Sequence, residues 1–315
     1  AALAVINSGT YKLIDCRAAT LEQTANNFHQ IIIDKNNSEK IFTRQFAQKG
    51  STNWLVLQHG PNGYHNWSGI TPSHDLVAAF EMADGTLMTG FSNVGDKKTS
   101  NPYLNREPRF YATIGFDGCT WGRVRPADAY PLDPAPLGQL QCGYYEVSGL
   151  QSSVPIKPPP NDTELTFKGL NGIDTRQGPI EDWNGSWTGY YERKLVDTSV
   201  DGQNYAQNVP WTYFRLAEMY LIAVEASVEL NELEDAADYL DALRNRIGMP
   251  DTKTTLTRRG KAFNQADMRE FVRHERFVEL AFEDHRYFDV RRWMIAPQTA
   301  SRKLTGVLVY GLLKP

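Results

Sequence analysis

The sequence contains few cysteines, and none of them is placed to bind a metal. Cys16, Cys119 and Cys142 are far apart in the chain, and no two of them form a Cys-x-x-Cys pair. This spacing excludes a zinc knuckle and a thioredoxin-like motif. One pair is free to form a disulfide, although the spacing does not indicate it, and we expect buried or unreactive thiols.

The sequence also lacks an excess of positive charge and a long apolar run. The net charge is −4 over 315 residues, so we expect no nucleic-acid partner. No apolar run approaches the ~20 residues that span a bilayer. The first residues, AALAVINSGTYKL, lack the basic start and the apolar stretch of a signal peptide. The chain as given therefore carries no targeting signal.

A charged segment near the C-terminus has some features of an active-site helix. His274-Glu275 would begin an H-E-x-x-H zinc motif, but Val278 stands where the second histidine is needed. Glu275, Glu279 and Glu283 share one helix face. A glycosidase pair must instead lie about 5 to 9.5 Å apart across a cleft, usually on different elements. We therefore expect no catalytic residue, metal or cofactor here.

Three like charges on one helix face need cations from a neighbouring element. Arg215, Arg244 and Arg246 lie on the two preceding predicted helices and can supply these cations. The sequence thus predicts structural ion pairs at this helix rather than catalysis.

The two ends of the chain have helical patterns, whereas the middle does not. Apolar residues recur at three- and four-residue steps over 213–230 and again over 233–249. The short break at Asn231-Glu232 requires the two helices to be antiparallel, and facing alanines allow close packing, as in tetratricopeptide-like hairpins. A third, long helix is expected over 265–294.

Short strands and loops are expected in the middle of the chain. Residues 40–46, 53–57 and 187–196 have β-type patterns, and a short helix is expected after Thr71-Pro72-Ser73. Eight of the seventeen prolines lie between Pro126 and Pro160. This density predicts a long surface loop rather than regular structure.

Several segments together resemble the SusD/RagB family. The C-terminal matches are ERFVELAFEDHRYFDVRRW (275–293), RLAEMYLIAVEAS (215–227) and AADYLDALRNRIGMP (236–250). The upstream matches are NSEKIFTRQF (37–46), TPSHDLVAAFEMADG (71–85), REPRFYATIGFDG (106–118) and GYYERKLV (189–196). Glu107 stands where the family usually has aspartate. The blocks follow the order of the family, which makes the resemblance specific.

The resemblance implies a fold and a place in the cell. The fold would be mainly α, with tetratricopeptide-like helical hairpins supporting a loop-rich, irregular ligand-binding face with a few short strands. Residues 1–36 would end the helical scaffold, 37–210 would form the ligand face, and 211–315 the hairpin and a long C-terminal helix. The protein would be a surface-exposed outer-membrane lipoprotein of Bacteroidetes. Its lipid anchor and first hairpins would belong to an N-terminal half preceding Ala1, and a tail would follow Pro315.

The glycine-rich loop HGPNGYHNWSG (59–69) offers candidate ligand contacts. Flat aromatic faces stack on the apolar side of a sugar ring, and neighbouring polar groups read its hydroxyls. Tyr64, His65, Asn66 and Trp67 supply these groups. Trp54 and Trp121 are second candidates, although packing in the core is the favoured interpretation for each. The alternative is that Trp67 fills the core.

Four other tryptophans are more simply assigned to packing. This interpretation covers Trp121, Trp183, Trp187 and Trp293. Trp183 and Trp187 lie in a second stretch rich in glycine and asparagine, so they have an alternative role as an extension of the binding face.

The resemblance implies non-catalytic binding of a glycan and its delivery to a SusC-like TonB-dependent transporter. A RagB-like capture of peptides is the first alternative and would be favoured by a charged cavity poor in aromatic residues. A glycoside hydrolase would require convergent carboxylates in a cleft. A pure interaction scaffold would be favoured if the aromatic residues of 59–69 were buried.

Overall fold

The computed structural model describes residues 1–47, 53–91, 101–123, 125–126, 138–147, 170–176, 178–181, 183–201 and 207–313. The chain forms two compact units. The first unit comprises Ala1–Phe46, Asp75–Thr113 and Val209–Leu304, and the second comprises Ala47–His74, Ile114–Asn208 and Thr305–Pro315. Most of the proline-rich loop predicted between 126 and 160 lies outside the described residues. The division into residues 1–36, 37–210 and 211–315 remains a prediction. It assigns a role to each region, and the two compact units do not test such roles.

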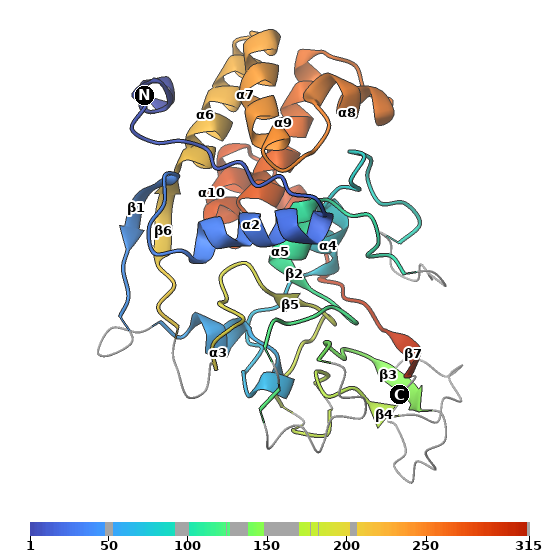
Figure 1. Cartoon of the computed structure of the whole chain (residues 1–315). Coiled ribbons are helices and arrows are strands. Elements are labelled where there is room, and N and C mark those ends of the chain that lie inside the picture. Colours follow the sequence, from blue (N-terminus) through green and yellow to red (C-terminus); the bar gives the residue numbers. More distant parts are fainter. Residues whose placement is uncertain are drawn as a thin grey trace. The chain divides into compact units, whose positions relative to one another are not determined.

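The first unit is mainly helical (Figure 1). Its helices are α1 (Ala2–Asn7), α2 (Leu21–Ile33), α4 (His74–Ala79), α5 (Pro108–Thr113), α6 (Leu216–Glu229), α7 (Leu233–Asn245), α8 (Thr252–Arg258), α9 (Gln265–Glu279), α10 (His285–Arg292) and α11 (Ala296–Ala300). Its two strands, β1 (Lys40–Arg44) and β6 (Trp211–Arg215), pair antiparallel.

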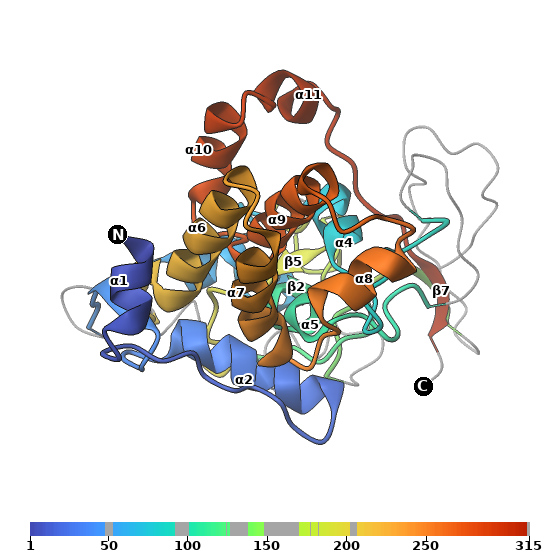
Figure 2. The same ribbon diagram turned by 90° about the horizontal axis from the view of Figure 1, so that it is seen from above.

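Helices α6 and α7 form the predicted antiparallel hairpin. They lie side by side, with α9 next to them, in both Figure 1 and Figure 2. Asn231, in the turn, has φ 61°, a left-handed conformation that asparagine tolerates. One buried apolar cluster joins the three helices, and its members include Leu221, Val228, Leu240 and Phe271. The helical spacing in the sequence therefore predicted this scaffold correctly.

The predicted helix over 265–294 is wrong as a single element. Helix α9 ends at Glu279 and α10 begins at His285. Phe282 and Asp284, both at φ 64°, interrupt the helix. A left-handed residue cannot continue a right-handed helix, so the chain changes direction here. Residues 265–294 contain neither glycine nor proline, so their pattern does not indicate this break.

The predicted ion pairs are present and form part of a larger buried ionic cluster. Arg215 donates to Glu279 at 2.8 Å and to Glu283 at 2.7 Å, Arg244 pairs with Glu275, and Arg246 donates to Glu279 at 2.6 Å. The whole cluster comprises Glu39, Glu81, Glu107, Glu275, Glu279 and Glu283 with Arg109, Arg215, Arg244, Arg246 and Arg259. This arrangement confirms that the charged face is structural.

The second unit contains short elements. These are α3 (Leu55–His59), the 3-10 helix η1 (Asn62–Tyr64), β2 (Ile114–Gly115), β3 (Tyr144–Val147), β4 (Leu170–Asn171), β5 (Tyr191–Glu192) and β7 (Tyr310–Leu313). Strand β3 pairs antiparallel with β4 and parallel with β7, and β2 pairs antiparallel with β5. The strand predicted over 53–57 is wrong because Leu55 begins α3, and the strand predicted over 187–196 is confined to β5.

The predicted fold class, mainly α with a few short strands, is confirmed. The cysteines are free thiols, with Cys16 and Cys142 buried and Cys119 partly buried. Among the described residues, no helix combines the length and the apolar character needed to cross a bilayer.

Candidate ligand-binding surface

The loop 59–69 of the second unit folds back onto α3. The Trp67 N–H donates to the Leu57 carbonyl at 2.6 Å, and the Ile70 N–H donates to the Gln58 carbonyl at 3.1 Å. These bonds hold the end of the loop against the helix from which it started. The backbone therefore fixes where the Trp67 side chain emerges.

Trp54 and Trp67 form an exposed aromatic pair. Trp54 precedes α3, and the side chains are 62% and 45% exposed. Their ring centroids lie 6.3 Å apart with an interplanar angle of 39°. Two large apolar rings gathered at the surface usually mark an interaction site. The pair provides flat surfaces of the kind that stack on an apolar ligand face.

The other predicted contacts in this loop occupy different environments. Tyr64 is buried, its ring centroid lies 6.3 Å from that of Trp121, and the Arg125 guanidinium lies 4.7 Å from its ring centroid. Asn66 is also buried, whereas His65 is half-buried with φ 60°. The buried Tyr64 and Asn66 side chains thus support the loop from the interior of the second unit. Trp67 and His65 are more exposed to solvent than these two.

Asn66 depends on a glycine next to it. A Cβ placed on Gly60 would lie 2.3 Å from the Asn66 amide nitrogen, far inside van der Waals contact. Glycine at position 60 therefore allows the Asn66 side chain to fill the space under the loop.

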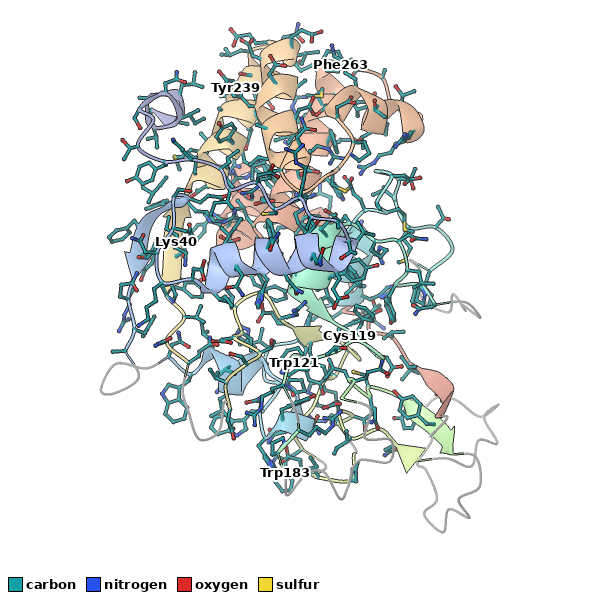
Figure 3. All side chains as sticks on the ribbon, in the orientation of Figure 1. Lys40, Cys119, Trp121, Trp183, Tyr239 and Phe263 are labelled. Atoms are coloured by element: carbon teal, nitrogen blue, oxygen red, sulfur yellow. The ribbon has the colours of Figure 1, made fainter. Side chains whose placement is uncertain are left out.

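A second loop, 183–191, also carries exposed tryptophans. Trp183 is 65% exposed and Trp187 is 75% exposed, so the packing predicted for them from the sequence is wrong. The Arg176 guanidinium lies 3.6 Å from the Trp187 ring centroid, a cation–π contact. Figure 3 shows Trp121 inside the second unit and Trp183 at its periphery. Trp121 is buried, as predicted.

Buried hydrogen bonds connect the two loops. Asn62 donates to the Thr175 carbonyl at 2.9 Å, and the Tyr191 hydroxyl lies 3.0 Å from Asn62 Oδ1 and 2.5 Å from the Asp174 carbonyl oxygen. The Ser186 N–H donates to the same hydroxyl at 3.2 Å. The loops 59–69 and 183–191 are therefore fixed to one scaffold within the second unit.

The charged groups beneath these loops are already paired. His59 Nδ1 lies 2.7 Å from Glu192 Oε2, and Arg125 donates to Asp174 at 2.9 and 2.6 Å. Glu192 and Asp174 are 0% exposed. Carboxylates in such positions hold backbone in place and cannot reach a bound substrate. The exposed groups on this surface are suited to binding.

Three side chains of the first unit are close enough together to be metal ligands. Glu81, His274 and Glu275 each bring one potential ligand atom within 4.8 Å of the others. Glu81 already pairs with Arg244 at 2.9 Å, and Glu275 pairs with Arg109 at 2.9 Å. Guanidinium groups thus supply the positive charge that a metal ion would bring, and we assign this cluster to ion pairing.

Comparison with known families gives a match over most of the chain. The family model described as the SusD family matches residues 28–312. A curated relative, SusD-like protein P25 of Formosa agariphila, is 36% identical over 108 residues, which cover 33% of this chain and 19% of the relative.

Solved structures of similar fold come from Bacteroides fragilis. A SusD-like protein is 26% identical with a TM-score of 0.66, over 94% of this chain and 50% of its own. A SusD-like carbohydrate binding protein is 24% identical with a TM-score of 0.60, over 91% of this chain and 51% of its own. The chain thus spans about half the length of these structures.

Proposed function

The chain belongs to the SusD family, and on that premise we propose that it binds a glycan at the bacterial cell surface without cleaving it. The observation that carries the proposal is the exposed pair formed by Trp54, which precedes α3, and Trp67, which lies on a loop fixed by backbone hydrogen bonds. Rings held in this way lose little conformational freedom when a sugar stacks on them. Trp183 and Trp187 are two further exposed rings of the second unit.

The proposal also covers what happens to the bound glycan. The protein would be an outer-membrane lipoprotein that delivers its ligand to a SusC-like TonB-dependent transporter. This part rests on the family, together with the carbohydrate binding named for a relative of the same fold. Of the predicted contacts, Trp54, Trp67 and His65 are proposed to touch ligand, and Tyr64 and Asn66 to support the loop.

Affinity electrophoresis tests the proposal. The protein is run through gels that contain one plant, host or microbial polysaccharide each, beside Trp54→Ala and Trp67→Ala. We expect one class of polysaccharide to retard the protein and each substitution to weaken binding by about tenfold or more, because a stacking surface is lost. Tyr287→Ala, which removes an exposed ring from the first unit, is the matched control and should leave the retardation unchanged.

Three results would contradict the proposal. Retardation that survives both tryptophan substitutions would move the glycan site elsewhere, and shortened oligosaccharides after incubation would make the protein a hydrolase. No retardation by any polysaccharide would favour peptide capture, and bound peptide would then be sought in protein purified with its transporter.

A further inference from the structure

Arg176 is a cationic side chain of the second unit that lies beside the exposed Trp187. Within the part of the chain that the structure describes, the Arg176 side chain forms no ion pair and no hydrogen bond. The residue is half-buried, and its nitrogen atoms are accessible to solvent. A ligand can therefore reach the guanidinium from solution.

The carboxylates nearest to Arg176 in the chain do not neutralise it. Asp174, two residues earlier, is 0% exposed and pairs with Arg125 at 2.6 Å. Glu181 is half-buried and forms no ion pair with Arg176, although the structure describes both residues. The positive charge of Arg176 is thus available to an anion from outside the protein.

The ring of Trp187 supports the guanidinium. The central carbon of the Arg176 guanidinium, Cζ, lies 3.6 Å from the centroid of this ring, which is 75% exposed. At this separation the guanidinium lies flat on the ring, a favourable cation–π arrangement. The N–H donors lie in the guanidinium plane, so they point to the side of the ring, where they are free to meet an acceptor.

The backbone holds this stacked pair in place. Thr175 and Ser186, the residues that precede the two members of the pair, form a parallel β-bridge. A Cβ placed on Gly185 would lie 2.7 Å from the Arg176 Cα, so only glycine permits this close approach. Ser186 Oγ also accepts from the Tyr190 N–H at 3.1 Å and donates to the Tyr190 carbonyl at 2.6 Å. Side chains held in this way lose little conformational freedom when a ligand binds.

We propose that the stacked pair of Arg176 and Trp187 binds an acidic sugar residue, one that carries a carboxylate or a sulfate ester. Its anionic oxygens accept hydrogen bonds from the guanidinium, whose paired donors match two oxygens of either group. The sugar ring packs against the exposed surface of Trp187. This inference rests on the proposed function, because it assigns a chemical class to the glycan.

Affinity electrophoresis with matched polysaccharides tests the proposal and separates the two anions. The carboxylated members are polygalacturonate and alginate, each beside its esterified form. The sulfated members are a carrageenan and dextran sulfate, each beside its unsulfated form. Esterification or removal of sulfate takes away the charge and leaves the sugar backbone in place. We expect an acidic polysaccharide to bind at least about fivefold more tightly than its neutral form. The pair that shows this preference identifies the anion.

Variants place the preference at the stacked pair. Arg176→Gln removes the charge and should weaken binding of the acidic polysaccharide about fivefold or more, to the level of the neutral form. Trp187→Ala removes an exposed ring and should also weaken binding of the acidic form. Arg302→Gln, a change at an exposed arginine of the first unit, is the matched control and should bind as the wild type does. Thermal melting checks that each variant is folded.

The outcomes separate this inference from the proposed function. Retardation by neutral polysaccharides alone, or equal retardation by acidic and neutral forms, overturns the acidic class and leaves glycan binding in place. No retardation by any polysaccharide overturns both. A preference that folded Arg176→Gln retains, or that Arg302→Gln loses to the same extent, also overturns the assignment to Arg176. A preference lost in Arg176→Gln and kept in Arg302→Gln supports it.

Discussion

Arg109 shows how much one side chain contributes to the first unit. Its guanidinium donates to Glu107 at 2.6 Å, to Glu275 at 2.9 Å and to Glu279 at 3.1 Å, and it is completely buried. Although burial opposes ionisation, Arg109 and Arg244 hold the pKa of Glu275 well below its usual range. The Glu275 carboxylate remains charged in the interior only because guanidinium groups surround it.

We predict that Arg109→Met destabilises the protein by about 3–5 kcal/mol, because it leaves buried carboxylates without their cation. Urea unfolding followed by circular dichroism measures the change. Arg17→Met is the matched control, because Arg17 pairs with Asp15 at the surface, and its midpoint should stay close to that of the wild type. A midpoint for Arg109→Met equal to that of Arg17→Met would contradict this prediction.

The candidate site was only partly predictable at the scale of single residues. The glycine-rich composition of 59–69 indicated a loop that carries aromatics, but Tyr64 and Trp67 lie three positions apart and take opposite environments. Which ring is buried depends on Trp121 and Arg125, which are remote in sequence. The exposure of Trp183 and Trp187 could not be predicted for the same reason, because it also depends on residues that are remote in sequence. Their glycine- and asparagine-rich surroundings, which resemble those of Trp67, were the signal for it.

At the scale of elements, the hairpin of α6 and α7 was predictable and the end of α9 was not. Apolar periodicity determines which helix faces are buried, so it predicts a hairpin without knowledge of other segments. The break at 280–284 follows from contacts with distant residues. Glu283, for example, forms an ion pair with Arg215 on β6, in which Arg215 Nε lies 2.7 Å from Glu283 Oε2. A single-sequence pattern contains no information on such a partner.

Asp284 permits a test of this break. It is exposed and has φ 64°, so substitutions there change backbone preference with little effect on packing. We predict that Asp284→Val destabilises the protein by about 1–2 kcal/mol, because a β-branched residue disfavours the left-handed conformation.

Asp284→Gly is the paired variant for the same experiment. Glycine adopts this conformation without steric cost, so its midpoint in urea unfolding should differ little from that of the wild type. If valine and glycine gave equal midpoints, the left-handed conformation at 284 would not limit the turn between α9 and α10.

At the scale of the whole molecule, the chain passes between the two units several times. The last passage, after Leu304, brings β7 into the second unit. There the Tyr144 N–H donates to the Val309 carbonyl at 2.9 Å, and the Val307 N–H donates to the Thr188 carbonyl at 2.8 Å. Composition and periodicity cannot predict such pairing, because β7 is short and its partner β3 is far away in sequence.

We predict that truncation after Leu304 weakens the second unit locally. Hydrogen exchange measured by mass spectrometry should become faster in peptides that contain 143–147 and 188–191, because their partners in 305–313 are gone. Peptides from α6 and α7 serve as the internal control and should exchange as before. Unchanged exchange over 143–147 would show that β3 does not depend on β7.

The buried ionic cluster has a consequence for the order in which the chain can fold. Its members come from all three segments of the first unit, and three of its glutamates lie between 275 and 283. Until the ribosome has added these residues, Arg109 and Arg215 each lack two of their three carboxylate partners, and Arg246 lacks one of two. A nascent chain that stops before α9 therefore cannot bury these arginines with their full set of partners, and completion of the first unit is postponed until α9 and the residues up to Glu283 have been synthesised.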